Sequence, residues 1–336
     1  MHLVGIVEAI NPVSARFRLE AYRGYLEKRG HSLEIAEVPD GMWARLKLWR
    51  SLRTADVVVL QRRLLGTWDL FQLRSLSPRL IFDYDDAIYQ RDTFAGKGTE
   101  STTRRRRFIH TVHAADAVMA GNLSLQHEAF RFADPRKVHL MPTVIDLADY
   151  PQSEHRHRGS GVHLAWIGTG EMVSVLEQSV DLWNGLGRHL PGVQFKVISQ
   201  RHPRFSYLTV LKAPWTEATE GLELATADIG VSWLPNDSWS RGDCGLRIIQ
   251  YMAAGLPVVA NTVGVQAEMV RNGKTGFLVD KPSHWVEALK TLIADPELRR
   301  QMGQAGRRIV ERDFNLSKWA ARWVPLVFGR QLRKAA

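Results

Sequence analysis

The sequence is poor in cysteine, because its 336 residues contain only Cys244. A single thiol excludes an internal disulfide and a cysteine zinc site, and it is typical of a protein in a reducing cytoplasm. Long apolar runs are also missing, and none approaches the ~20 residues that a membrane-spanning helix needs. The N-terminal MHLVGIVEAI has neither a basic leader nor a small-residue cleavage site, which favours a first strand over a signal peptide.

Acidic residues are outnumbered: 35 Asp and Glu stand against 45 Lys and Arg, a formal net charge of +10. This balance favours anionic partners such as nucleotide phosphates or acidic lipids, although a general basic bias explains it equally well. No nucleic-acid-binding module is recognisable, so no nucleic-acid partner is expected.

Short apolar runs alternate with helical patterns in both halves of the chain. This alternation predicts an α/β fold with parallel sheets covered by helices on both faces. A polar stretch at 151–160 reads as a linker between two Rossmann-like, doubly wound domains that face a cleft, an N-terminal one at 1–150 and a C-terminal one at 161–312. Residues 313–336 are expected to form a helix that crosses back to the first domain. Ligands of such sheets bind beyond the carboxyl ends of the strands.

The stretch RGDCGLRIIQYMAAGLPVVANTVG, residues 241–264, reads as a loop, a helix, a glycine stop and a buried strand. Gly242 and Gly245 permit tight turns, and the helix that starts near Gly245 would point its free N–H groups and positive dipole end at a diphosphate. Arg247 adds a charge with fork geometry, and Gln250 lies on the same helical face, where it suits ribose hydroxyls. The alternative is a plain helix-to-strand turn with polar residues on its wet side.

Residues 242–279 resemble the donor-binding segment of the family-4 type of retaining nucleotide-sugar glycosyltransferases, which are of the glycosyltransferase group 1 type and have the two-domain GT-B fold. Weaker similarity in HLAWIGTGEMVSVL, RLIFDYDDAIY, DAVMAGNLSL and LRRQMGQAGRRIVERDF extends the resemblance over nearly the whole chain. It implies sugar transfer with retention of configuration, with the nucleotide sugar as co-substrate and no obligatory metal or other cofactor.

The chain departs from that family's pattern at several positions. Gly242 and Gln250 stand where the family usually has two glutamates, and Asp243 stands where the most similar subgroup has a lysine. The usual Arg…Lys phosphate pair after the first strand of the second domain is also absent. The diphosphate charge would then be met by Arg241, Arg247, Arg201 or Arg16.

The expected donor-binding residues are Gly168, Thr169, Arg201, Trp215, Arg241, Cys244, Gly245, Leu246, Arg247 and Gln250. Trp215 is expected either to stack on the nucleobase or to be an ordinary rim or core aromatic. Cys244 has no obvious base beside it, so packing is favoured over nucleophilic chemistry.

FDYDDAIY places Asp83, Asp85 and Asp86 at a strand end, where carboxylates can hold sugar hydroxyls, act as acid and base, or merely cap a turn. The expected catalytic residues are Asp85, Asp86 and Asp243, with no metal site. Ser14, Arg16 and Arg18 follow the first strand and are expected on the acceptor or phosphate side, with Ser14 also a candidate helix cap.

GMWARLKLWRSLR carries an apolar stripe at helical spacing with interleaved basic residues, and RRRR follows at 104–107. Two interpretations remain open: a helix that faces the core with a solvated basic side, or an anionic membrane surface.

The leading hypothesis is a cytoplasmic glycosyltransferase that acts in cell-surface glycan or glycolipid synthesis, either free or peripheral on the inner face of the membrane. Its acceptor would be a carbohydrate, a lipid or a small molecule. The alternatives are a non-catalytic subunit that binds sugar nucleotides and a basic protein that binds membranes or polyanions.

Overall fold

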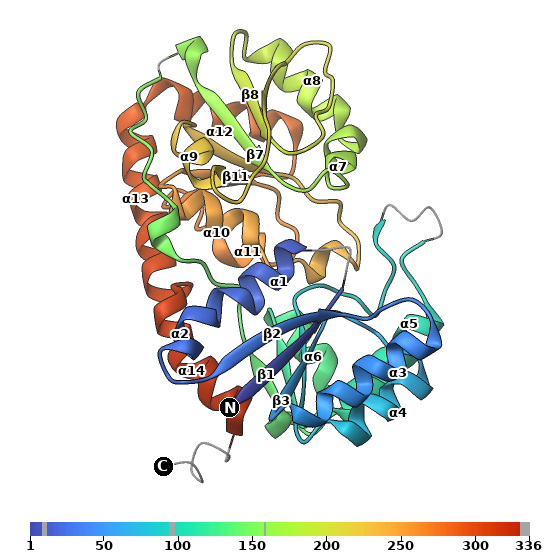
Figure 1. The fold of residues 1–336 in the computed structure, drawn as a ribbon. Helices are drawn as coiled ribbons and strands as arrows, with labels where there is room; N and C mark the ends of the chain where they lie inside the picture. Colours follow the sequence, from blue (N-terminus) through green and yellow to red (C-terminus); the bar gives the residue numbers. More distant parts are fainter. Residues whose placement is uncertain (9–11, 94–97, 158, 330–336) are drawn as a thin grey trace. The chain divides into compact units, whose positions relative to one another are not determined.

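The computed structural model describes residues 1–8, 12–93, 98–157 and 159–329, which form two compact α/β units. Unit 1 contains residues 1–145, the short segment 237–244 and the C-terminal helix α14, and unit 2 contains residues 146–236 and 245–315. Figure 1 shows a sheet flanked by helices in each unit. No helix of the described ranges is long and apolar enough to cross a membrane.

Unit 1 is built on a six-stranded parallel sheet in the order β2-β1-β3-β4-β5-β6. The strands are β1 (His2–Val7), β2 (Ser32–Glu37), β3 (Val57–Gln61), β4 (Leu80–Tyr84), β5 (Ala117–Ala120) and β6 (Val138–Leu140). Three of the four inner strands, β3, β4 and β5, are buried at every residue, as expected for a sheet that is covered on both faces.

Helices cover both faces of this sheet. One face packs against α1 (Pro12–Arg18), η1 (Glu20–Tyr22), α2 (Arg23–Glu27) and α14 (Leu316–Phe328). The other packs against α3 (Met42–Ser51), η2 (Leu52–Thr54), α4 (Thr67–Leu76), α5 (Thr102–Ala114) and α6 (Leu123–Phe130). The Trp323 ring of α14 stacks on Tyr22 at 4.4 Å, so the end of the chain completes the first of these two cores.

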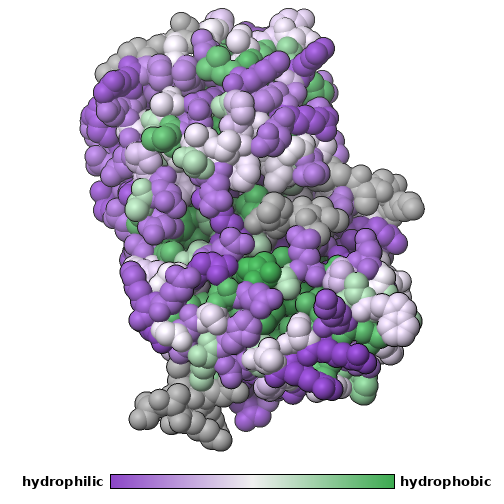
Figure 2. Space-filling view, viewed as in Figure 1, coloured by the Kyte–Doolittle hydropathy of each residue, from purple (hydrophilic) through white to green (hydrophobic). Residues whose placement is uncertain are grey.

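Unit 2 repeats the plan with a second parallel sheet, in the order β12-β11-β10-β7-β8-β9. Its strands are β7 (His163–Ile167), β8 (Gln194–Ile198), β9 (Thr209–Ala213), β10 (Ile229–Ser232), β11 (Val258–Ala260) and β12 (Gly276–Leu278). Its longer helices are α8 (Val180–His189), α10 (Leu246–Ala253), α12 (Pro282–Ala294) and α13 (Pro296–Asp313), and its shorter ones are α7 (Val173–Gln178), α9 (Glu220–Ala225) and α11 (Gln266–Met269). On the face shown in Figure 2, polar side chains predominate in both units, and the apolar patches are larger over unit 1.

The structure differs from the sequence-based expectations at three places, and a fourth expectation is untested. The helix predicted after the first strand is broken into α1, η1 and α2, and Ser14 lies inside α1 rather than at a cap. The helix α4 was not predicted. Segment 237–244, expected in the donor domain, belongs to unit 1. Ala9 and Ile10, predicted to extend the first strand, lie outside the described residues.

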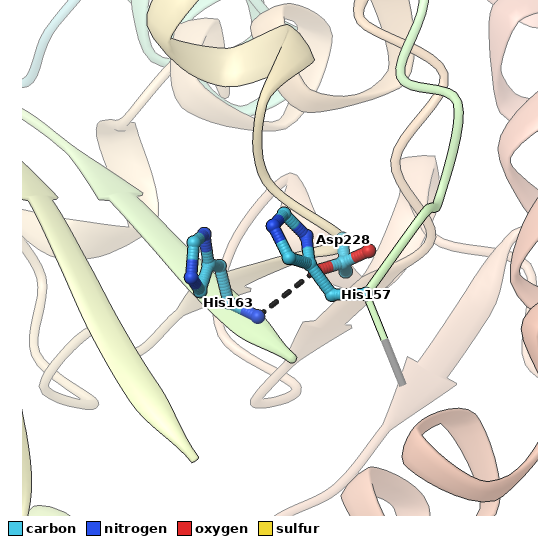
Figure 3. A group of neighbouring side chains, drawn as sticks. All are labelled: His157, His163 and Asp228. Carbon is cyan, nitrogen blue, oxygen red and sulfur yellow. Dashed lines mark hydrogen bonds and ion pairs between the residues drawn. The ribbon is translucent and has the colours of Figure 1, made fainter. Parts of the chain in front are cut away.

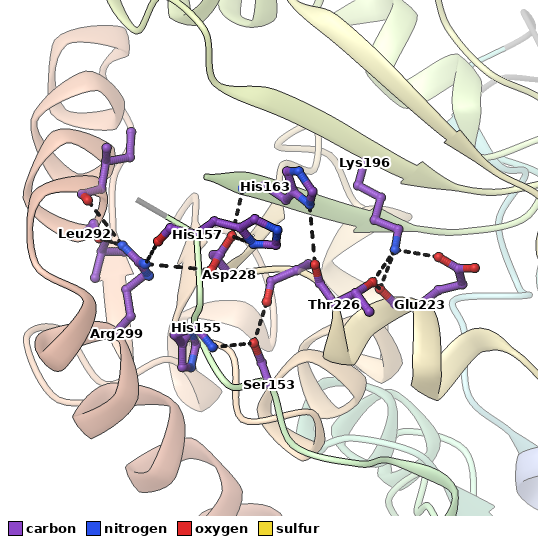
Figure 4. Close-up of polar contacts among 12 residues, drawn as sticks. Ser153, His155, His157, His163, Lys196, Glu223, Thr226, Asp228, Leu292 and Arg299 are labelled. Atoms are coloured by element: carbon purple, nitrogen blue, oxygen red, sulfur yellow. Dashed lines mark hydrogen bonds and ion pairs between the residues drawn. The ribbon is translucent and has the colours of Figure 1, made fainter. Parts of the chain in front are cut away.

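The predicted linker is fixed to unit 2 through Asp228, whose side chain is fully buried at the start of β10. One carboxylate oxygen accepts from the backbone N–H of His163 at 2.9 Å and lies 2.8 Å from Nδ1 of His157 in the linker (Figure 3). The other oxygen lies 3.7 Å from the guanidinium of Arg299, which is also fully buried (Figure 4). Asp228 therefore ties the linker, the sheet and α13 together.

We expect Asp228→Asn to lower the free energy of unfolding by about 3–5 kcal/mol, because it leaves the buried Arg299 without its counter-charge. Urea denaturation checks this expectation. Asp181→Asn is the matched control, since Asp181 is exposed in the first turn of α8, and its effect should be below about 1 kcal/mol. Equal free energies of unfolding for Asp228→Asn and the parent would refute the claim that Asp228 holds the linker, the sheet and α13 together.

Candidate functional site

The carboxyl end of β4 is the most highly charged point of unit 1. Asp83 is the fourth residue of the strand, and Asp85 and Asp86 follow its last residue. Asp83 is fully buried and pairs with Arg18 of α1, whose Nε donates to it at 3.0 Å. Arg18 also donates to the carbonyl of Met141 and is itself only 2% exposed. The structure thus places Arg18 inside the core of the unit, not on a ligand-facing surface.

Arg62 is the counter-ion of the other two carboxylates. Its guanidinium lies 2.5 Å from Asp86 and 3.4 Å from Asp85. It follows β3 directly with φ at 59°, a conformation that costs a non-glycine residue energy and is often kept at functional sites. Sequence analysis missed Arg62, although a basic residue after one strand and acidic residues after its neighbour could have signalled the pair.

Asp85 is oriented by two further side chains. Ser14 donates to its Oδ2 at 2.7 Å, and Gln61 of β3 in turn donates to Ser14. The other oxygen, Oδ1, is buried and accepts no hydrogen bond from the described residues. Ser14, predicted on the acceptor side, therefore lies at this site, and the charge of Oδ1 is met by the Arg62 guanidinium at 3.4 Å rather than by a hydrogen bond.

Asp86 is a carboxylate whose protonation state is strongly perturbed. Burial raises its pKa to about 7 against the opposing charge of Arg62, and the negative charges of Asp85 and Asp243 act in the same direction as burial. A carboxyl group that titrates near neutrality can exchange a proton with a ligand hydroxyl at cellular pH.

Segment 237–244 brings Asp243 to the same end of the sheet. The side-chain amide of Asn122, which caps α6, donates to the carbonyls of Gly242 and Asp243 at 3.1 and 3.0 Å. A Cβ at Gly242 would meet Ala87 at 2.6 Å, so this glycine allows a close approach to unit 1. The three acids expected to be catalytic therefore lie in one unit.

Cys244 is a packing residue of that unit. It is buried in the core cluster that includes Tyr84 and Phe108, and a Cβ at Gly121 would lie 2.3 Å from its sulfur. Burial raises the pKa of the thiol well above its ordinary value, and the charge of Asp85 adds to this effect. The thiol therefore stays protonated and is a poor nucleophile.

The corresponding edge of the unit 2 sheet carries Arg247, in the first turn of α10. Its Nε donates to the carbonyl of Ile167, the last residue of β7, at 2.8 Å, and its guanidinium lies over the Trp166 ring. It also donates to Ser232, the last residue of β10, at 3.2 Å. Arg247 thus places a positive charge at the carboxyl ends of two adjacent strands.

Gly245 sets the start of α10. Its φ of 71° is left-handed, a conformation that glycine adopts readily. A Cβ there would meet Met269 at 2.5 Å and Val265 at 2.9 Å, so a larger residue would also clash. Leu246 begins the helix, and Gly168 and Thr169 directly follow β7 on the same sheet edge.

Gln250 and Trp215 belong to one buried hydrogen-bond chain in unit 2. The Gln250 amide donates to the Tyr150 hydroxyl at 3.1 Å, and that hydroxyl donates to Glu220 at 2.5 Å. The Trp215 indole donates to the other Glu220 oxygen at 2.8 Å. Both residues are therefore positioned by the fold, and their roles toward ribose and nucleobase stay predictions.

The remaining predicted arginines differ in their surroundings. Arg201 pairs with Glu177 on the surface of unit 2. Arg16 is half-buried with its guanidinium over the Phe17 ring, and Arg241 is exposed in η7 (Ser240–Gly242). Among the four arginines proposed to meet a diphosphate, Arg247 is the one fixed at strand ends.

Among the described residues, one group has metal-ligand chemistry: His157, His163 and Asp228, whose candidate ligand atoms lie within 4.8 Å of one another (Figure 3). The Asp228 carboxylate already serves His157, the His163 backbone and Arg299, and a buried guanidinium beside it opposes a second cation. The contacts of this group explain it as the linker anchor.

A comparison of the sequence with known families matches residues 233–309, which carry α10, β11 and most of α13, to "Glycosyl transferases group 1". This segment is therefore similar to the group 1 glycosyltransferases. It includes Asp243, Gly245, Arg247 and Gln250, so the family match covers most of the segment singled out from the sequence.

Curated relatives align over a similarly limited length. This chain is 35% identical over 79 residues to an α-1,3/1,6-mannosyltransferase, ALG2, of Rhizomucor pusillus, covering 23% of this chain and 17% of that protein. It is 44% identical over 79 residues to a D-inositol 3-phosphate glycosyltransferase of Corynebacterium efficiens, covering 23% and 18%. The alignments thus span under a fifth of these relatives.

Solved structures match the whole chain in fold. The Anabaena protein Alr3699/HepE, crystallised with UDP and glucose, superposes with a TM-score of 0.73 at 14% identity, covering 96% of this chain and 98% of that one. Sucrose-phosphate synthase of Thermosynechococcus elongatus gives 0.73 at 17% identity, covering 100% of both. The group 1 segment therefore lies within a chain of the GT-B type, as predicted.

We expect Gly121→Ala to destabilise the protein by about 1–3 kcal/mol, because the added methyl group overlaps the Cys244 sulfur and crowds the backbone of Asp85 at 3.0 Å. Adding Cys244→Ala should recover part of the loss, since it removes the closer of the two contacts. Gly24→Ala is the control: Gly24 lies in α2 with open space around it, so the variant should be no less stable than the parent. Failure of Cys244→Ala to recover any stability would contradict the packing role of the thiol.

The raised pKa of Asp86 predicts a pH-dependent stability. Between pH 3.8, the ordinary pKa of the group, and about pH 7, the Asp86 carboxyl stays protonated in the folded protein and is ionised in the unfolded chain. The stabilisation is therefore fully present below the ordinary value and is lost as pH rises toward about 7.

The free energy of unfolding should accordingly fall more steeply over this window in the parent than in Asp86→Asn. Urea denaturation at a series of pH values measures both slopes, and the exposed-site variant Asp181→Asn should follow the parent. Parallel curves for the parent and Asp86→Asn would refute the assignment.

Proposed function

We propose that the protein transfers a sugar from a nucleotide-diphosphate sugar to an acceptor hydroxyl. The observation that carries the proposal is the start of α10, where the left-handed Gly245 begins the helix and Arg247 fixes a guanidinium in its first turn. Helix N-termini and arginine forks both bind phosphate groups. This arrangement lies within the segment that matches the group 1 family.

Unit 2 would hold the donor. The positive helix end and Arg247 would stabilise the negative charge that develops on the leaving diphosphate, which is an electrostatic contribution to catalysis. Trp215 and Gln250 would contact the nucleoside. The Anabaena neighbour was crystallised with UDP and with UDP-glucose, which supports a nucleotide-sugar donor of this kind.

Unit 1 would hold the acceptor. Oδ1 of Asp85, which accepts no hydrogen bond from the described residues, and the carboxyl of Asp86, whose pKa is about 7, are suited to accept hydrogen bonds from sugar hydroxyls. Asp243, held by Asn122 at the same end of the sheet, adds a third carboxylate. The proposal includes retention of configuration, independence from metal ions, a carbohydrate, lipid or small-molecule acceptor, and a role in cell-surface glycan synthesis at the cytoplasmic side of a membrane.

A non-catalytic subunit that binds sugar nucleotides is the second candidate. Gly242 packs against Ala87, and the Gln250 amide binds Tyr150. Neither residue supplies a carboxylate at the two positions where the resemblance leads one to expect glutamates. The two candidates share donor binding and differ in turnover.

The test starts with thermal unfolding in the presence of UDP, GDP and dTDP, followed by release of free nucleotide from the matching sugar donors with and without EDTA. At least one nucleotide should raise the melting temperature.

Arg247→Met should weaken the binding of that nucleotide by about tenfold or more, the loss expected for one charge-assisted contact. Arg271→Met is the control, because Arg271 is exposed in the same unit.

The outcomes separate the candidates. Turnover that persists in EDTA, with the anomeric configuration retained in the product, supports the full proposal. A nucleotide-induced shift without turnover from any donor supports the binding subunit, and Asp243→Lys then tests whether that residue suppresses activity. No shift with any nucleotide diphosphate would refute both.

A further inference from the structure

Four large apolar side chains on α3 and α4 are exposed to solvent. Met42 is 57% and Trp43 78% exposed in the first turn of α3, and Trp68 is 47% and Phe71 65% exposed near the start of α4. The apolar stripe predicted for α3 is thus divided, since Trp49 and Leu52 face the core and Met42 and Trp43 do not. Exposed aromatic residues gathered in this way mark an interaction surface.

The topology brings these residues to one edge of unit 1. Helices α3, α4 and α5 each connect strands of an all-parallel sheet, so each begins at the edge where the strands end. The three helices are neighbours, with α3 against α4 and α4 against α5 (Figure 1). Asp69 joins the first pair by accepting from Arg45 at 2.9 Å and Trp49 at 3.2 Å. The exposed aromatic residues therefore lie near one another, at the starts of adjacent helices.

The third helix adds positive charge at the same edge. Its first two turns contain four consecutive arginines, of which Arg104, Arg106 and Arg107 are exposed. Neither α3 nor α5 has an acid in its first turn. Cations at the positive end of a helix dipole are unfavourable, and a bound anion would relieve that repulsion. We call Trp43, Trp68, Phe71, Arg104, Arg106 and Arg107 the α3–α5 rim.

We propose that the α3–α5 rim docks on a phospholipid bilayer with anionic headgroups. Tryptophan and phenylalanine side chains enter the boundary between headgroups and acyl chains, while arginines pair with lipid phosphates. Charge complementarity favours this occupant, because the rim combines exposed aromatic side chains with exposed arginines on a chain of net charge +10. The apolar side chains lie on helix ends rather than in a groove that would seat a partner helix.

The rim lies at the same edge of the sheet as Asp85 and Asp86, which follow β4. A bilayer docked there would face the end of unit 1 to which we assign the acceptor. That consequence rests on the proposed function, whereas docking itself does not, so vesicle binding is measured without donor or acceptor.

The experiment is flotation of the full chain with two kinds of vesicle, one of phosphatidylcholine alone and one with added phosphatidylglycerol. The protein should float with the anionic vesicles and not with the neutral ones, and added salt should weaken binding. The combined variant Trp43→Ser, Trp68→Ser, Phe71→Ser and the combined variant Arg104→Gln, Arg106→Gln, Arg107→Gln should each lower the partition coefficient about tenfold or more.

Two controls match these variants in unit 2. Tyr207→Ser with Leu222→Ser removes exposed apolar side chains, and Arg188→Gln, Arg271→Gln, Arg308→Gln removes the same amount of charge from exposed sites. Both should bind like the parent, and thermal unfolding confirms that every variant is folded. The proposal fails if the parent does not float with anionic vesicles, if the control arginine variant loses as much binding as the rim variant, or if polyuridylate is bound and vesicles are not.

Discussion

The charged end of unit 1 depends on the ion pairs that the Arg62 guanidinium forms with Asp85 and Asp86. Asp83 is neutralised by Arg18, which leaves Arg62 as the cation bonded to Asp85 and Asp86, with Asp243 near them. Two carboxylates cannot remain ionised at short range without such a partner. Placing the Arg62 side chain beside these carboxylates requires a left-handed backbone conformation, which costs free energy. The buried strand β3, which directly precedes Arg62, holds the backbone in that conformation.

The second constraint is the path of the chain between residues 236 and 245. The stretch that looked from sequence like one loop and helix is divided at Cys244 and Gly245 between the two units. Asn122 and the close contact at Gly242 fix the loop on unit 1, and the left-handed Gly245 starts α10 in unit 2. Asp243 and Arg247 of this stretch therefore lie at different sheets. Their spacing along the sequence could not show this.

Local patterns predicted most of the fold, since runs such as VVVLQ and LIFDY are apolar enough to form buried parallel strands. The position of Arg247 in the first turn of α10 was predicted because it depends on a helix end that glycine residues mark, and its contact with phosphate stays a prediction. Arg62 was missed because its role depends on a backbone conformation and on a neighbouring strand distant in sequence. Gln250 was assigned to a ligand, and its bond to Tyr150 depends on a tertiary contact that helical spacing does not encode.

The two sheet edges have opposite chemistry, and this contrast explains why a transferase is a better reading than a simple binder. Around β4 of unit 1, Asp85 and Asp86 share Arg62 and Asp243 lies near them, so that edge favours a ligand that donates hydrogen bonds and carries no negative charge. Around α10 of unit 2, the positive end of the helix and Arg247 favour an anion. A sugar acceptor fits the first edge and a nucleotide diphosphate the second. One protein that carries both has a place for each reactant of a glycosyl transfer, whereas a nucleotide-binding subunit has no need of the first.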